Sequence, residues 1–117
     1  MDKQHVRERL IEIGVIPVVR ASSSAQALMA AQAVRDGGIP IVEITMTVPG
    51  ALDVIRELRK ASDSSVLIGA GTVLNKKMAQ DCVDAGAQFL VSPGLDVPSV
   101  EFAQKEETLM LAGALTP

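Results

Sequence analysis

The sequence has 117 residues, 48% of them hydrophobic and 21% charged, a balance that predicts one globular domain over residues 1–117 rather than a disordered chain. Its net charge of −3 offers no electrostatic basis for binding nucleic acid or an anionic membrane surface, and no apolar run is long enough to span a bilayer. A single cysteine, Cys82, excludes an internal disulfide and favours the cytoplasm, while a single histidine, His5, excludes a His-rich metal site.

Short apolar runs alternate with longer helical stretches along the chain. The predicted strands are 15–20, 41–46, 66–68, 89–91 and 108–111, and the predicted helices are 25–36, 50–60, 75–85 and 98–105. Pro17 lacks a backbone donor, which is best tolerated near a strand start or at a sheet edge. The residues around His5 are expected to form an exposed tail. The residues predicted to pack in the core are Cys82 and the methionines Met29, Met46, Met78 and Met110.

The strands recur about every two dozen residues, which predicts a parallel α/β sheet with right-handed crossovers. An open doubly wound sheet and a (β/α)8 barrel both fit this pattern. Even spacing and the absence of a G-x-G-x-x-G turn favour the barrel. A complete barrel needs eight strands and usually 200 to 250 residues. We therefore expect a partial barrel with strands 1–5 and helices 1–4, lacking the C-terminal strands.

Barrel active sites lie at the C-terminal ends of the strands. Glu43 lies within a predicted buried strand, where a carboxylate must be paired or must have a raised pKa. A raised pKa suits a general acid or base, whereas an ion pair with Arg20 would make Glu43 structural. Arg20 can hold a substrate carboxylate or merely neutralise Glu43. The segments 69–72 and 92–94 are tight turns by sequence, although Thr72 can also offer donors to a ligand.

Five segments, taken in order, carry a family resemblance over about residues 14–117. They are Ile-Pro-Val-Val-Arg (16–20), Gly-Gly-Ile-Pro-Ile-Val-Glu-Ile-Thr-Met-Thr-Val-Pro (37–49), Ile-Gly-Ala-Gly-Thr-Val (68–73), Asp-Ala-Gly-Ala-Gln-Phe-Leu-Val-Ser-Pro-Gly (84–94) and Gly-Ala-Leu-Thr-Pro (113–117). Together they resemble the 2-keto-3-deoxy-6-phosphogluconate (KDPG) aldolases, also called 4-hydroxy-2-oxoglutarate (KHG) aldolases.

The resemblance implies a trimeric (β/α)8-barrel lyase that splits a keto-acid substrate into pyruvate and an aldehyde through a Schiff base, with no cofactor or metal. Glu43 resembles the family's general acid/base, and Thr72 the threonine that holds the pyruvyl carboxylate. Pro93 resembles the proline that lines the same pocket. Thr47 stands where many members carry an arginine for the substrate carboxylate, a role that Arg20 is expected to take over in this chain.

Schiff-base chemistry needs a lysine of depressed pKa, and none of the five lysines of this chain lies in a predicted strand. The family places its reactive lysine on strand 6 and its phosphate-binding turns on strands 7 and 8, beyond this sequence. We therefore expect no Schiff-base lysine in this chain and no meaningful aldolase activity from it alone.

Two other functions fit the same residues. The chain could be a non-catalytic partial barrel that binds a small oxo-acid or assembles with other copies. It could also resemble an epimerase, which would need acid or base residues on other strands, where only Glu43 is found. The sequence does not distinguish phosphorylated from unphosphorylated substrates.

Overall fold

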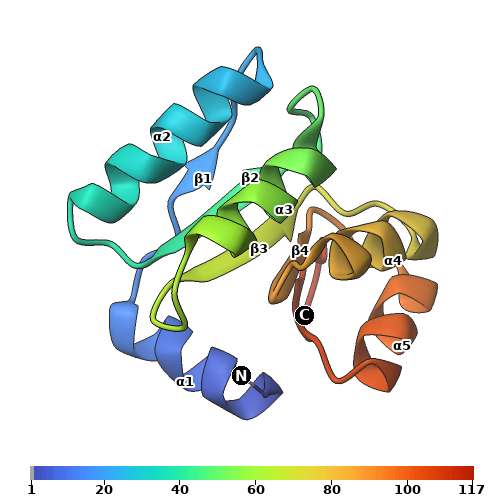
Figure 1. The fold of residues 1–117 in the computed structure, drawn as a ribbon. Coiled ribbons are helices and arrows are strands. Elements are labelled where there is room, and N and C mark those ends of the chain that lie inside the picture. Colours follow the sequence, from blue (N-terminus) through green and yellow to red (C-terminus); the bar gives the residue numbers. More distant parts are fainter. Residues whose placement is uncertain (1) are drawn as a thin grey trace.

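The computed structural model describes residues 2–117, in which helices and strands alternate. The elements are α1 (Lys3–Ile13), β1 (Val18–Val19), α2 (Ser24–Asp36), β2 (Ile41–Thr45), α3 (Ala51–Ala61), β3 (Leu67–Gly71), α4 (Lys76–Ala85), β4 (Phe89–Ser92), α5 (Val97–Lys105) and β5 (Leu109–Ala112). Figure 1 shows how they follow one another in space. From β1 onward the order confirms the predicted βα repeat.

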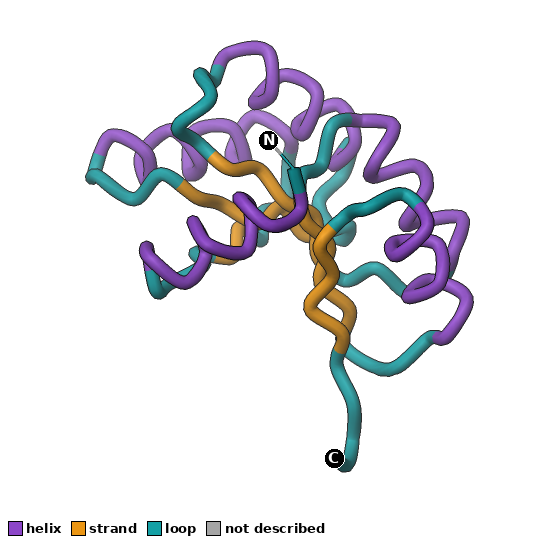
Figure 2. The backbone as a smooth tube through the Cα atoms, turned by 90° about the horizontal axis from the view of Figure 1, so that it is seen from below, coloured by secondary structure: helices purple, strands orange, loops and turns teal. Residues whose placement is uncertain are grey.

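The five strands form one parallel sheet in the order β1-β2-β3-β4-β5. Each strand pairs with its neighbours in sequence, and the helices from α2 to α5 form an arc around one side of the strands (Figure 2). A doubly wound sheet would reverse its strand order partway across. The sequential order is that of a (β/α) barrel wall, so the prediction of a partial barrel is confirmed.

Two apolar cores lie on opposite faces of the sheet. On the outer face, residues such as Ile44, Ile68 and Leu90 pack against the surrounding helices. On the inner face a smaller cluster joins one buried residue from each of three strands to one residue of α1. Its members are Ile41, Leu67, Phe89 and Val6. The inner cluster closes the N-terminal end of the barrel wall, so the C-terminal ends of the strands are left for a site.

Helix α1 was not predicted from the sequence, because the residues around His5 were expected to be an exposed tail and no element was assigned before residue 15. The side chain of Asp2 caps its N-terminus by accepting from the His5 N–H, and Gly14 ends it in the left-handed conformation at φ 79°. Val6 is buried, with Leu10 and Ile13 packed beside it. This spacing of four and three residues is the apolar stripe of a helix, and it was the signal available in the sequence.

Two further expectations are corrected in detail. Strand β1 has two residues rather than six, beginning after Pro17, whose carbonyl still accepts from the Glu43 N–H at 2.9 Å. The position of Pro17 at the start of an edge strand agrees with prediction. Met29 is 70% exposed and does not pack in the core. Among residues 2–117 the helices are too short and too polar to cross a membrane.

Candidate active site

Glu43 lies in the middle of β2, on the face of the sheet that turns away from the outer helices. Parallel pairing sets it opposite Val18 of β1 and Gly69 of β3. All five residues of β2 are buried, and Glu43 is only 6% exposed. Its inward neighbours along β2 are Ile41, in the inner core, and the buried Thr45. The carboxylate therefore stands between an apolar floor and the C-terminal end of the barrel wall.

The surroundings of Glu43 favour its neutral form. Burial raises the pKa of the Glu43 carboxyl above its ordinary value, and the nearby Arg20 guanidinium opposes that rise only in part. Within residues 2–117 no ion pair joins the two side chains. The alternative in which Arg20 simply neutralises Glu43 through a direct ion pair is therefore not what the structure contains.

Arg20 and Thr47 lie at neighbouring strand ends and are exposed. Arg20 follows β1 directly, and Thr47 follows β2 by two residues. The buried Thr45 links these two ends, because its hydroxyl donates to the Val19 carbonyl at 3.1 Å and lies 2.9 Å from the Thr47 hydroxyl. Thr45 thus fixes the backbone that carries Arg20.

Thr72 follows β3 directly and has a left-handed backbone, with φ at 59°. A β-branched residue rarely adopts this conformation, which costs of the order of 1–3 kcal/mol and occurs mostly at functional sites. The next residue, Val73, donates to the Val91 carbonyl at 3.1 Å, which ties this turn to β4. Thr72 is half-buried, so its hydroxyl is held at the same end of the sheet as Arg20 and Thr47.

The segment 69–71 departs from the sequence prediction. It was expected to be a tight turn, yet Gly69 and Gly71 are both part of β3 and buried. The signal available in the sequence was the spacing of the two glycines, because residues two apart in a strand share one face. On the inner face of β3, two consecutive positions therefore carry no side chain beside Glu43.

Pro93 follows β4 and is exposed, next to the buried Ser92. The Gly113 N–H donates to the Ser92 carbonyl at 3.0 Å and so brings the end of β5 against the Ser92–Pro93 peptide. A Cβ on Gly113 would lie 2.5 Å from the Pro93 carbonyl oxygen, so glycine is required for this approach. Pro93 is thereby fixed at the same rim as Thr72.

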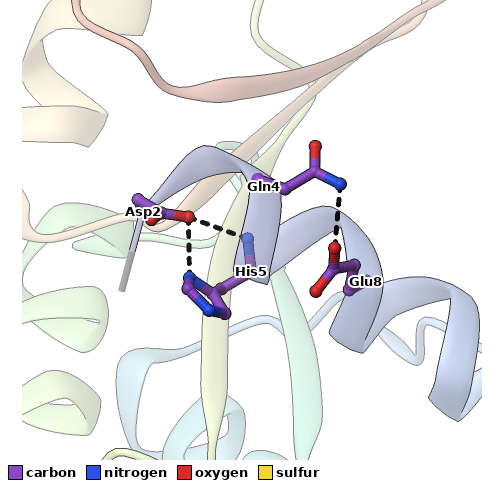
Figure 3. A network of polar contacts seen from close by, with 4 residues as sticks. All are labelled: Asp2, Gln4, His5 and Glu8. Carbon is purple, nitrogen blue, oxygen red and sulfur yellow. Dashed lines mark hydrogen bonds and ion pairs between the residues drawn. The ribbon is translucent and has the colours of Figure 1, made fainter.

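The lysines and the histidine lie on helices rather than on the strands. All five lysines are exposed and lie on helices, namely Lys3, Lys60, Lys76, Lys77 and Lys105. His5 forms part of the α1 cap shown in Figure 3, where its Nδ1 lies 2.8 Å from the Asp2 carboxylate. Within residues 2–117 no group of three or more His, Cys, Asp or Glu side chains gathers as metal ligands would.

A sequential parallel sheet with an inward carboxylate and polar residues at its C-terminal rim defines one wall of a (β/α)-barrel enzyme site. The sequence profile of the KDPG and KHG aldolase family matches residues 6–117. The chain belongs to this family.

Individual relatives agree with that assignment. The KHG/KDPG aldolase of Escherichia coli K12 is 34% identical over 102 residues, covering 87% of this chain and 47% of the relative. The 2-dehydro-3-deoxy-phosphogluconate aldolase of Treponema pallidum is 42% identical over 89 residues, or 76% of this chain and 42% of the relative. The chain spans about half the length of the curated relatives it matches.

Solved structures give the same result. The KDPG aldolase of Legionella pneumophila, with pyruvate captured as a covalent carbinolamine intermediate at low pH, superposes with a TM-score of 0.79 at 35% identity. The match covers 86% of this chain and 48% of that one. This likeness supports the assignment of the five-stranded sheet as part of a barrel wall.

Proposed function

We propose that this chain forms the acid/base half of the active site of a class I aldolase, which cleaves KDPG or KHG to pyruvate and an aldehyde. The observation that carries the proposal is Glu43, a buried inward carboxylate in a member of the KDPG and KHG aldolase family. Burial raises the pKa of the Glu43 carboxyl, and a raised pKa is the shift that suits a carboxyl to both giving and taking a proton. Glu43 would move protons at the carbinolamine, the enamine and the substrate hydroxyl.

The remaining rim residues would hold the pyruvyl part of the substrate. The Thr72 hydroxyl and backbone would bind its carboxylate, and Arg20 would supply a positive charge and a bidentate donor from the end of β1, two strands away. Thr47 would complete the polar side of the pocket, and Pro93 would close its apolar side. Each of these four residues follows its strand by one or two positions, which supports their acting together.

The Schiff-base amine would come from outside these 117 residues. A reactive lysine needs a depressed pKa in a dry pocket, and the five lysines are exposed on helices. For Lys77, a hydrogen bond to Asp81 instead raises the pKa. We therefore expect the chain alone to have no meaningful aldolase turnover. The same observation favours one alternative, a non-catalytic partial barrel that binds a small oxo-acid.

Assembly and location are further parts of the proposal. A homotrimer in the cytoplasm fits the family, and a buried free thiol at Cys82 fits a reducing compartment. A designed protein cage built by fusing symmetric oligomeric domains is 29% identical to this chain and has a TM-score of 0.78. That likeness supports self-association, although the number of subunits is a proposal.

A chimera tests the catalytic role of Glu43. This chain would replace the matching segment of the E. coli KHG/KDPG aldolase, and pyruvate release from KDPG would be followed with lactate dehydrogenase. We expect turnover in the chimera, a loss of at least about 100-fold with Glu43→Gln, and little change with the exposed control Glu57→Gln. A folded chimera without turnover, or one that Glu43→Gln leaves fully active, would reject the proposal.

A further inference from the structure

Two glycines on the inner face of β3 leave space that their neighbours' side chains fill. A Cβ on Gly71 would lie 1.6 Å from Glu43 Oε1 and 2.5 Å from its Cδ. A Cβ on Gly69 would lie 2.3 Å from the ring of Phe89. Both distances are far below van der Waals contact, so neither position accepts even a methyl group in this arrangement.

The backbone does not require glycine at either position. Gly69 and Gly71 lie within a regular strand, and neither has a positive φ. A strand interior normally disfavours glycine because it has no side chain to pack. The requirement at these two positions is therefore one of space for Glu43 and Phe89.

The register explains the layout of this space. Glu43 pairs with Gly69, yet its carboxylate reaches across to Gly71, one inward position further toward the C-terminal end of β3. Consecutive inward positions of a strand are about 6.6 Å apart. The tip of the buried Phe89 ring fills the position at Gly69, on the N-terminal side of the carboxylate.

We propose that Gly71, Gly69 and Phe89 are positioning residues for Glu43: Gly71 provides the space in which the carboxylate lies, and Gly69 admits the Phe89 ring that closes the adjacent inward position to water. This inference deepens the proposed function and rests on it for the role of Glu43. The geometry itself explains why burial, rather than an ion pair, dominates the environment of this carboxyl.

The first test is a double-mutant cycle in the 117-residue chain. Gly71→Ala adds one methyl group, and Gly94→Ala is the matched control, because a Cβ on Gly94 meets no atom within 4 Å. In urea unfolding we expect Gly71→Ala to raise the unfolded-to-folded ratio about tenfold or more relative to Gly94→Ala. In the Glu43→Ala background the same change should raise the ratio less than about threefold.

The cycle remains decisive if Gly71→Ala alone does not fold. A folded Glu43→Ala/Gly71→Ala double variant would then support the proposal, since removing the carboxylate restores the space. An equal penalty in both backgrounds, or a double variant that does not fold although Glu43→Ala does, would overturn it.

The second test reads the environment of the carboxyl directly. Carbon-13 NMR titration of Glu43 should show that Gly71→Ala and Phe89→Leu both move its titration midpoint down toward the ordinary glutamate range. Two control variants should leave the midpoint unchanged. They are Gly94→Ala and Phe102→Leu, and Phe102 packs against the core on the outer side of the sheet. Midpoints that stay unchanged in both test variants would overturn the proposal. Neither test measures turnover, so each can fail while the chimera is active.

Discussion

The Thr45 hydroxyl donates a hydrogen bond to the Val19 carbonyl at 3.1 Å and so joins the ends of β2 and β1 beneath the rim of the site. The bond is buried, and the residue that follows Val19 is Arg20. The buried Thr45 side chain therefore holds the backbone from which the exposed Arg20, a candidate binding residue, projects.

Replacing Thr45 with valine should destabilise the fold, because the Val19 carbonyl would lose a buried donor while the shape is kept. We expect the free energy of unfolding to fall by about 1–2 kcal/mol in urea titrations. Thr116→Val, at an exposed position outside this hydrogen-bonded group, is the control and should change it by less than about 0.5 kcal/mol. Equal effects from the two variants would show that the Thr45 bond contributes nothing.

The stability of the chain should depend on pH through Glu43. Its folded pKa is raised, so the folded state binds more protons than the unfolded state between the ordinary pKa of 4.5 and the folded value. The stabilisation from Glu43 is complete below pH 4.5 and is lost as the pH rises through the folded pKa. The free energy of unfolding of the native chain minus that of Glu43→Gln should therefore fall across this window. A difference that rises with pH would mean that the charge of Arg20, rather than burial, has the larger effect on the pKa of Glu43.

Helix α1 should contribute to stability through one buried contact. Val6→Ala removes apolar surface from the inner core and should lower the free energy of unfolding by about 1.5–3 kcal/mol. Ile11→Ala, on the same helix at a position that is 63% exposed, should change it by less than about 0.5 kcal/mol. If both variants are neutral by urea unfolding, α1 does not cover the barrel wall as described.

The Cys82 thiol should be unreactive in the folded chain. Burial, with a smaller contribution from Asp81, raises its pKa to about 12, so at pH 8 only about one thiol in 10⁴ is ionised. Labelling by a disulfide reagent at pH 8 should be at least about 1,000-fold slower in the native chain than in urea. Native labelling at the unfolded rate would contradict the buried position of Cys82 in α4.

The strands, their order and the barrel class could be predicted because each rests on a local pattern. Apolar runs such as 66–68 and 89–91 are uninterrupted, and the even spacing of the strands leaves few topologies. Helix α1 was missed because its apolar stripe has only three residues. Its caps, Asp2 and Gly14, were nevertheless readable in the sequence.

The site was harder to predict because its contacts join distant residues. That Glu43 needs a glycine at 71, or that Gly113 must touch Pro93, depends on strand register and not on local composition. The sequence reading took Gly69 and Gly71 for a turn because glycine usually marks one. The roles of Arg20, Thr47, Thr72 and Pro93 stay predictions, although the structure sets all four at the ends of neighbouring strands.

Borohydride trapping with pyruvate on the purified 117-residue chain, read by intact mass, tests most directly whether these residues hold the acid/base half of the site without its nucleophile. We expect no pyruvyl adduct, because the five lysines are exposed on helices and none lies on a strand beside Glu43. A single stoichiometric adduct on one of these lysines would contradict the claim that this chain holds the acid/base residues without the Schiff-base nucleophile.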